Sequence, residues 1–96
     1  MKLEQIIREK SEDIKKVAQM HGANNVRIFG SIARGEESQE SDIDFLVDIG
    51  AETSSWFPAG LILDLEKILG RRVEVVTEKG LNHLIRDRIL NEAMPI

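Results

Sequence analysis

A β-prone run that stops at a glycine and a serine is the feature that most constrains this sequence. The run covers residues 26–29, and Gly30 follows it, where the missing Cβ lets the backbone approach a ligand closely. Ser31 then offers a hydroxyl group where residues 32–34 predict a short helical turn that ends at Gly35. Free backbone N–H groups at such a turn favour an anion. Taken alone, the Gly-Ser pair also fits an ordinary turn with a helix cap.

Two acidic residues follow in the next β-prone segment, residues 42–48. Side chains alternate between the two faces of a strand, so Asp42 and Asp44 are expected to share a face. Two carboxylates this close repel each other unless a cation compensates, and Mg²⁺ prefers oxygen ligands of this kind. The alternative is a turn residue followed by an exposed strand acid, although Asp is depleted in strands.

A third acid, Glu74, lies in a further predicted strand over residues 72–76. Val73 and Val75 are expected to point into the core, which turns Glu74 to the other face. If this strand neighbours the segment with the two aspartates, three carboxylates converge. Such a set is the minimum that a two-metal phosphoryl or nucleotidyl transfer site needs.

The remaining segments predict helices between these strands. Residues 2–20 form an amphipathic helix that ends near Gly22, and residues 81–91 form the last helix, with Leu81, Leu84, Ile85 and Ile89 facing inward. A middle helix, capped by Ser54 or Ser55 and with Pro58 in its first turn, ends at Gly70; its buried stripe is Leu61, Ile62, Leu65, Ile68 and Leu69. The predicted order is α, β, α, β, α, β, α, an α/β fold with a small mixed sheet, as one domain over residues 1–96.

Composition excludes several classes of function. The 96 residues hold no cysteine, which removes disulfides and cysteine nucleophiles, and no apolar run approaches a membrane span. A net charge of −4 argues against direct binding of nucleic acid. The N-terminus does not resemble a signal peptide, so we expect a cytoplasmic protein without membrane contact.

The motif that runs from Gly30-Ser31-Ile32-Ala33-Arg34-Gly35 to Ser41-Asp42-Ile43-Asp44 resembles the signature of the DNA polymerase β-like nucleotidyltransferase superfamily. It is most similar to the minimal nucleotidyltransferases, the MntA-type antitoxins paired with HEPN-domain ribonuclease toxins. The resemblance extends through the segment around Glu74 to residues 86–93 and so covers most of the chain.

This resemblance implies roles for particular residues. Gly30 and Ser31 would contact the triphosphate of ATP, Asp42 and Asp44 would coordinate Mg²⁺, and Glu74 would complete a site for two ions. Two positions depart from the common pattern: Ile32 stands where the family often has Arg, and Glu74 stands where it commonly has Asp.

The resemblance also implies an activity. The expected enzyme is a Mg²⁺-dependent protein adenylyltransferase that moves AMP from ATP to a tyrosine hydroxyl of a cognate HEPN toxin. The alternative is a non-catalytic antitoxin that neutralises the toxin by occlusion. Homo-oligomers and hetero-oligomers both stay open.

Several other side chains have two interpretations. Arg34 would neutralise phosphate charge or pair with Glu36 or Glu37. The arginines at positions 71, 72, 86 and 88 would be solvated or would contact a partner, and Trp56 and Phe57 would pack in the core or form a partner surface.

Overall fold

The computed structural model describes residues 2–36, 38, 41–51, 53 and 57–96. Its centre is a four-stranded sheet in the order β3-β2-β1-β4. The strands are β1 (Ala23–Phe29), β2 (Ile43–Ile49), β3 (Val73–Thr77) and β4 (Met94–Pro95). β1 runs antiparallel to both β2 and β4, whereas β2 and β3 are parallel. The expected small mixed sheet of an α/β fold is therefore confirmed.

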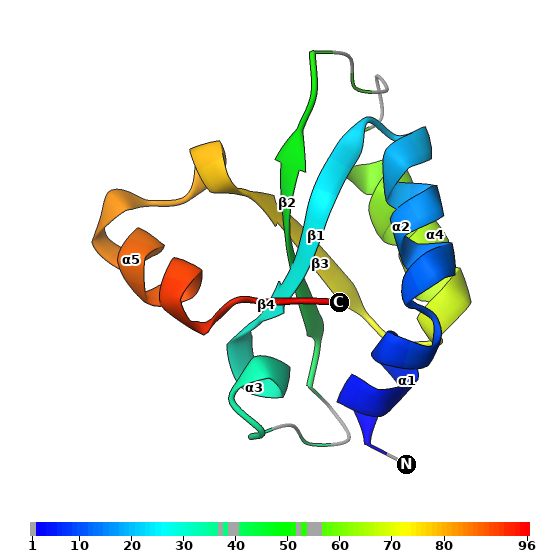
Figure 1. The fold of residues 1–96 in the computed structure, drawn as a ribbon, viewed down its shortest axis with the longest axis horizontal. Helices are drawn as coiled ribbons and strands as arrows, with labels where there is room; N and C mark the ends of the chain where they lie inside the picture. Colours follow the sequence, from blue (N-terminus) through cyan, green and yellow to red (C-terminus); the bar gives the residue numbers. More distant parts are fainter. Residues whose placement is uncertain (1, 37, 39–40, 52, 54–56) are drawn as a thin grey trace.

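Helices cover both faces of this sheet (Figure 1). The helices α1 (Leu3–Glu9), α2 (Ser11–Met20) and α4 (Ala59–Leu69) lie on one side. The 3₁₀ helix η1 (Glu78–Gly80) and α5 (His83–Glu92) lie on the other, and the short α3 (Gly30–Ala33) sits at one end of the sheet. Within the described residues, no helix is long and apolar enough to cross a membrane.

Alternation along β2 separates the core from the site. Ile43, Phe45 and Val47 are buried in the main apolar cluster, together with residues of α1, α2 and α4. Asp44 and Asp48 alternate with these positions along the strand and are therefore turned to the opposite face. Leu46 shares that face and is also fully buried. The buried apolar residues of β2 thus fix the strand in the core, and the strand in turn fixes the position of its aspartates.

The first helix is interrupted rather than continuous over residues 2–20. Lys10 separates α1 from α2, although its N–H still donates to the oxygen of Ile6 at 3.1 Å, so the chain bends without breaking apart. The Lys10 Nζ donates to the oxygen of Ile68 at 2.9 Å, which attaches the bend to the end of α4. Gly22 follows the second helix with φ +84°, as a C-terminal glycine should.

The sheet is larger than the pattern predicted. β1 begins at Ala23 rather than at residue 26, because Asn25 adopts a positive φ of 49° and a register shift next to it extends the pairing. β4 was not expected, since two residues that include Pro95 give no periodic signal and pair only at the sheet edge. β1 ends at Phe29 as predicted, and β2 and β3 each begin and end one residue later than predicted.

The prediction that the last helix buries four apolar residues is wrong in part. Ile89 is buried at 4% exposure, but Leu84 is 80% exposed and Ile85 is 40% exposed. Leu81 precedes the helix and is partly buried. The helix is shifted to His83–Glu92 by a cap at Asn82, whose side chain accepts from the N–H of Leu84. Because α5 packs near its C-terminal end, its first turn stays open to solvent.

The middle helix ends where it was predicted to end, but its predicted start is wrong: α4 begins at Ala59, after Pro58, and has no side-chain cap. Gly70 follows α4 with φ +66°, and Pro58 stands at its N-cap. Phe57 packs against the core, in line with one of the two interpretations, whereas Ser54, Ser55 and Trp56 lie outside the described residues.

Candidate active site

The turn from β1 into α3 brings Gly30 against Asp44. Gly30 is buried and has φ +76°, a conformation that L side chains rarely adopt. A Cβ at this position would overlap Oδ2 of Asp44 and lie 3.2 Å from its Cγ. The glycine is therefore required both by the backbone conformation and by the neighbouring carboxylate.

The turn is closed by its own backbone. The N–H of Arg34 donates to the oxygen of Gly30 at 3.1 Å, and the N–H of Glu36 donates to the oxygen of Ser31 at 2.8 Å. Ser31 is partly buried. Ile32 is buried at 1% exposure in the main cluster, so an apolar residue at this position serves packing rather than contact with a ligand.

Strand pairing sets Asp44 beside Glu74. The two residues are direct partners in the parallel ladder of β2 and β3, while Asp44 pairs with Phe29 on its other side. Asp42 stands immediately before β2 rather than inside it. The third predicted carboxylate is thus next to the second, on a neighbouring strand as expected.

The pKa of Asp44 shows how closely the acidic groups gather. This pKa is raised from 3.8 to about 6, mainly by burial and in addition by the negative charges of Glu74 and Asp42 and by a hydrogen bond with Glu74. The Arg34 guanidinium acts in the opposite direction. All three predicted acids and the arginine therefore lie within electrostatic reach of one carboxyl group.

This donor set suits a hard divalent cation, because it consists of carboxylate oxygens whose repulsion a cation would offset. The acids lie near one another, but their side chains do not yet form a complete set of metal ligands. In the described part of the chain, no three His, Cys, Asp or Glu side chains are arranged to hold a metal ion. If a cation binds here, Asp42, Asp44 and Glu74 are the groups to hold it.

Among the residues that the structure describes, two carboxylates accept hydrogen bonds from Arg34. Its Nε donates to Glu36 at 3.0 Å and its Nη1 donates to Glu92 at 2.9 Å, and these hydrogen bonds raise its pKa. The pairing with Glu36 was one of the two interpretations from the sequence, and Glu37 lies outside the described residues. Glu92 was not anticipated: it lies 58 residues away, and no local pattern distinguishes it from a solvated helix acid.

An open depression of about 470 Å³ adjoins this arginine. Arg34, Arg88, Asn91 and Glu92 line it, so the end of α5 forms one wall of the space beside the signature turn.

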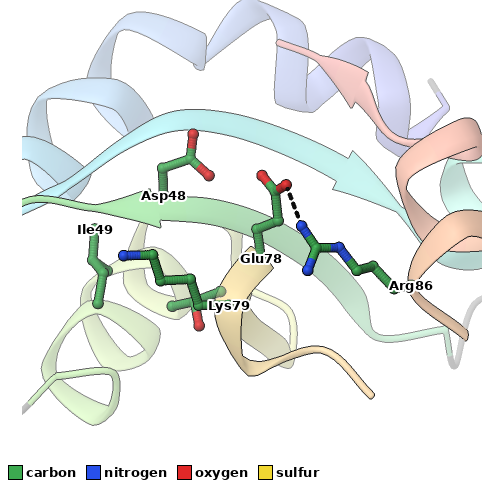
Figure 2. Close-up of a pocket in the computed structure, with 6 residues that line it drawn as sticks. Asp48, Ile49, Glu78, Lys79 and Arg86 are labelled. Atoms are coloured by element: carbon green, nitrogen blue, oxygen red, sulfur yellow. Dashed lines mark hydrogen bonds and ion pairs between the residues drawn. The ribbon is translucent and has the colours of Figure 1, made fainter. Parts of the chain in front are cut away.

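A second cavity, of about 270 Å³, lies at the other end of β2 (Figure 2). It is lined by Asp48, Ile49, Thr77, Glu78, Lys79 and Arg86. Asp48 is four residues from Asp44 along the strand, about 13 Å away. Its carboxylate accepts from Arg27 at 2.9 Å and from Asn25 at 2.9 Å, and Arg86 donates to Glu78 at 3.0 Å. Asp48 is thus engaged in ion pairing away from the three acids.

The histidines and the other arginines lie outside this cluster. His21 Nε2 contacts Asp64 at 2.7 Å between α2 and α4, and His83 is exposed at the start of α5. Arg71 is partly buried and bonded to the backbone, while Arg72 and Arg88 are exposed. The four arginines therefore do not share one environment.

The mixed sheet and the acidic cluster beside a glycine turn together define this protein as a nucleotidyltransferase. A family model described as "Nucleotidyltransferase domain" matches residues 1–95, and the chain belongs to that family.

Relatives agree with this assignment. A protein of Methanocaldococcus jannaschii named "Putative protein adenylyltransferase" is 43% identical over 76 residues, which cover 79% of this chain and 82% of that protein. The "Protein adenylyltransferase MntA" of Thermococcus cleftensis is 34% identical over 80 residues, which cover 83% and 81%.

Solved structures agree on the fold. One described as "Structure of putative minimal nucleotidyltransferase" has a TM-score of 0.85 and 42% identity, and the match covers 100% of this chain and 97% of the other. A toxin-antitoxin complex crystallised with AMP-PNP has a TM-score of 0.73 over 88% of this chain and 69% of its own, at 19% identity, and shares the fold alone.

Proposed function

We propose that this protein transfers AMP from ATP to a hydroxyl group of a partner protein in a Mg²⁺-dependent reaction. The partner is a toxin of the HEPN family, the acceptor is a tyrosine, and the modification silences the toxin. Relatives named protein adenylyltransferases, at 43% and 34% identity, support the reaction class. The toxin-antitoxin complex with the same fold supports the type of partner.

The observation that carries the proposal is the contact between the Gly30 turn and Asp44. The Gly30 backbone lies against the carboxylate, and Glu74 is the direct ladder partner of the same residue. A polyphosphate held along the turn would therefore lie beside the acids, which is the arrangement that nucleotidyl transfer requires.

Each residue has a role in this reaction. Gly30 and Ser31 bind the triphosphate, and Arg34 stabilises its negative charge. Asp42, Asp44 and Glu74 hold two Mg²⁺ ions. When bound, the ions neutralise charge on the triphosphate and lower the pKa of the acceptor hydroxyl.

One P–O bond forms and one P–O bond breaks in this reaction. The acceptor oxygen loses its proton and attacks the α-phosphorus of ATP, forming one P–O bond. The bond from that phosphorus to the bridging oxygen of the β-phosphate breaks, and pyrophosphate leaves. The products are the adenylylated protein, pyrophosphate and one proton.

We also propose a setting for the enzyme. Residues 1–96 act as one minimal domain that binds the nucleotide and leaves recognition to the toxin, in a hetero-oligomer. The reaction takes place in the cytoplasm, without direct nucleic-acid binding or membrane contact.

Intact-mass analysis tests this function. The protein is incubated with ATP, Mg²⁺ and the proposed cognate HEPN toxin, and the toxin is expected to gain the mass of one or more adenylyl groups. Asp42→Asn and Asp44→Asn should abolish the gain, whereas Asp87→Asn, which neutralises an exposed acid on α5, should not. No mass gain with the parent protein would refute the proposal. If neutralisation of the toxin also survives both aspartate changes, the occlusion mechanism is favoured.

A further inference from the structure

Asp42 occupies an unusual place among the three acids, because it lies outside the sheet. Asp44 and Glu74 are paired in the ladder of β2 and β3, which fixes their backbones. Asp42 precedes β2 and has no such pairing. Some other contact must set the direction in which its carboxylate points.

The residues on both sides of Asp42 are bonded to the same short connection between α4 and β3. On one side, Nη2 of Arg71 donates to the oxygen of Ser41 at 2.7 Å. On the other, the N–H of Ile43 donates to the oxygen of Arg72 at 2.9 Å. The two residues that flank Asp42 are therefore bonded to two consecutive residues, Arg71 and Arg72, from a distant part of the chain.

The Arg71 guanidinium also holds the segment before Asp42. The same Nη2 donates to the oxygen of Ser38 at 3.2 Å. Ser41 donates its N–H to that oxygen at 3.1 Å, and the N–H of Ser38 donates to Oγ of Ser41 at 2.8 Å. The Arg71 side chain thus donates to the carbonyl groups of Ser38 and Ser41, two residues that are also hydrogen-bonded to each other.

The connection that carries Arg71 is itself rigid. Gly70 adopts the left-handed conformation and donates its N–H to the backbone carbonyl oxygen of Glu66 at 2.8 Å. The Glu66 side chain then accepts from the N–H of Val73 at 3.1 Å. Arg71 is partly buried between these fixed points. A partly buried, planar guanidinium loses little further freedom when it donates to the backbone.

We propose that Arg71 is a positioning residue that orients Asp42 through the carbonyl groups of Ser38 and Ser41. We call these three residues the Arg71 clamp. The inference rests on the proposed function, because it assigns Asp42 to a divalent cation. Groups that orient metal ligands without touching the metal change metal affinity by about 10-fold to 100-fold when they are removed.

Three variants separate the clamp from its surroundings. Arg71→Ala removes it, and Arg71→Lys keeps the charge but replaces the planar guanidinium with a compact, strongly hydrated ammonium. Arg72→Ala is the matched control, because it removes an adjacent exposed arginine side chain and leaves the Arg72 carbonyl in place. All three are compared with the parent protein by circular dichroism and thermal unfolding.

Two measurements that need no acceptor protein test the inference. The first is the affinity for Mn²⁺ in the presence of a non-hydrolysable ATP analogue, measured by electron paramagnetic resonance. We expect about a 10-fold loss in Arg71→Ala, most of that loss in Arg71→Lys, and none in Arg72→Ala. The second is amide hydrogen exchange of the peptide containing residues 41–43, which should accelerate only in the two Arg71 variants.

The outcomes distinguish the two proposals. Folded Arg71→Ala protein with the affinity of the parent would overturn the clamp, even if adenylyl transfer is observed. Reduced affinity in that variant, together with a parent protein that never modifies a toxin, would support the clamp and overturn the proposed acceptor reaction. A parent protein that binds no Mn²⁺ would overturn both.

Discussion

Gly30 and Asp44 are in contact where the first strand turns into the signature helix, and the contact leaves no room for a side chain at residue 30. An added Cβ would lie 3.2 Å from Cγ of Asp44 and overlap its Oδ2. The glycine therefore does more than permit a positive φ. It sets how closely the backbone of the proposed phosphate turn approaches the carboxylate.

Gly30→Ala is expected to be destabilising and to weaken metal binding. The positive φ alone costs about 1–2 kcal/mol for an L side chain, and the overlap with Asp44 adds about 1–3 kcal/mol. Urea unfolding measures the loss of stability, and Mn²⁺ affinity in the presence of an ATP analogue measures the displacement of Asp44.

Gly35→Ala is the matched control for that change. Gly35 has φ +73°, close to the +76° of Gly30, but nothing lies within 4 Å of the position that a Cβ would take there. It should lose about 1–2 kcal/mol from the backbone alone and retain metal affinity. Equal effects of the two substitutions on metal affinity would show that the contact with Asp44 has no role.

Stability should fall as pH rises through the titration of Asp44. The pKa of this carboxyl is about 6 in the folded protein and 3.8 ordinarily, so the folded state binds more protons between these values. The free energy of unfolding then decreases from pH 3.8 to about 6. After allowance for solvent around this half-buried group, the decrease is about 1–2 kcal/mol.

Asp44→Asn should remove that pH dependence. Without divalent cations, the variant is expected to be more stable than the parent at pH 8 and nearly equal to it at pH 4, although adenylyl transfer is lost. Urea unfolding at a series of pH values provides the comparison. The same slope in both proteins between pH 4 and pH 6 would exclude Asp44 as its source.

Glu74→Gln should lower the pKa of Asp44. Burial is the largest cause of the raised value and remains, so the pKa should settle between 3.8 and about 6 once the charge of Glu74 is gone. A carbon NMR titration of the Asp44 carboxyl measures it. Asp87→Asn removes an exposed acid on α5 and should leave the value unchanged. An unaltered titration in Glu74→Gln would contradict the pairing of the two carboxylates across β2 and β3.

The two ends of α5 should respond differently to truncation. Leu84→Ala removes a side chain that is 80% exposed and should change stability by less than about 0.5 kcal/mol. Ile89→Ala removes one that is 4% exposed and should cost about 2–5 kcal/mol. Urea unfolding of both variants decides whether α5 packs only near its C-terminal end, and similar losses would contradict that arrangement.

Local patterns predicted much of the fold because they act over a few residues. The alternation in residues 42–48 identified β2 and its buried face, and Gly70 identified the end of α4. The same reasoning failed for α5, where periodic apolar residues suggested a buried stripe. Only Ile89 of that stripe is buried in the folded protein. The spacing of apolar residues along a helix cannot show which of its turns packs against the rest of the protein.

The candidate site was likewise predicted only in part from the sequence. The acids at positions 42, 44 and 74 were expected from their spacing and from the family resemblance, and the charges of Asp42 and Glu74 do act on Asp44. The contacts that surround them were not expected. Glu92 reaches Arg34 across 58 positions, and Arg71 reaches Ser41 across 30. An ion pair or a hydrogen bond to the backbone between residues this far apart produces no periodic pattern in the sequence.

The sequence by itself therefore determined which residues can carry out chemistry, because residue type and short-range spacing decide donor atoms, turns and strand faces. Only the tertiary structure decided how these groups meet, because strand register and packing place residues that are distant in the chain at the same point. The contact of Gly30 with Asp44 and the bond of Arg71 to Ser41 exist because a folded sheet brings separate segments within a few ångströms of each other.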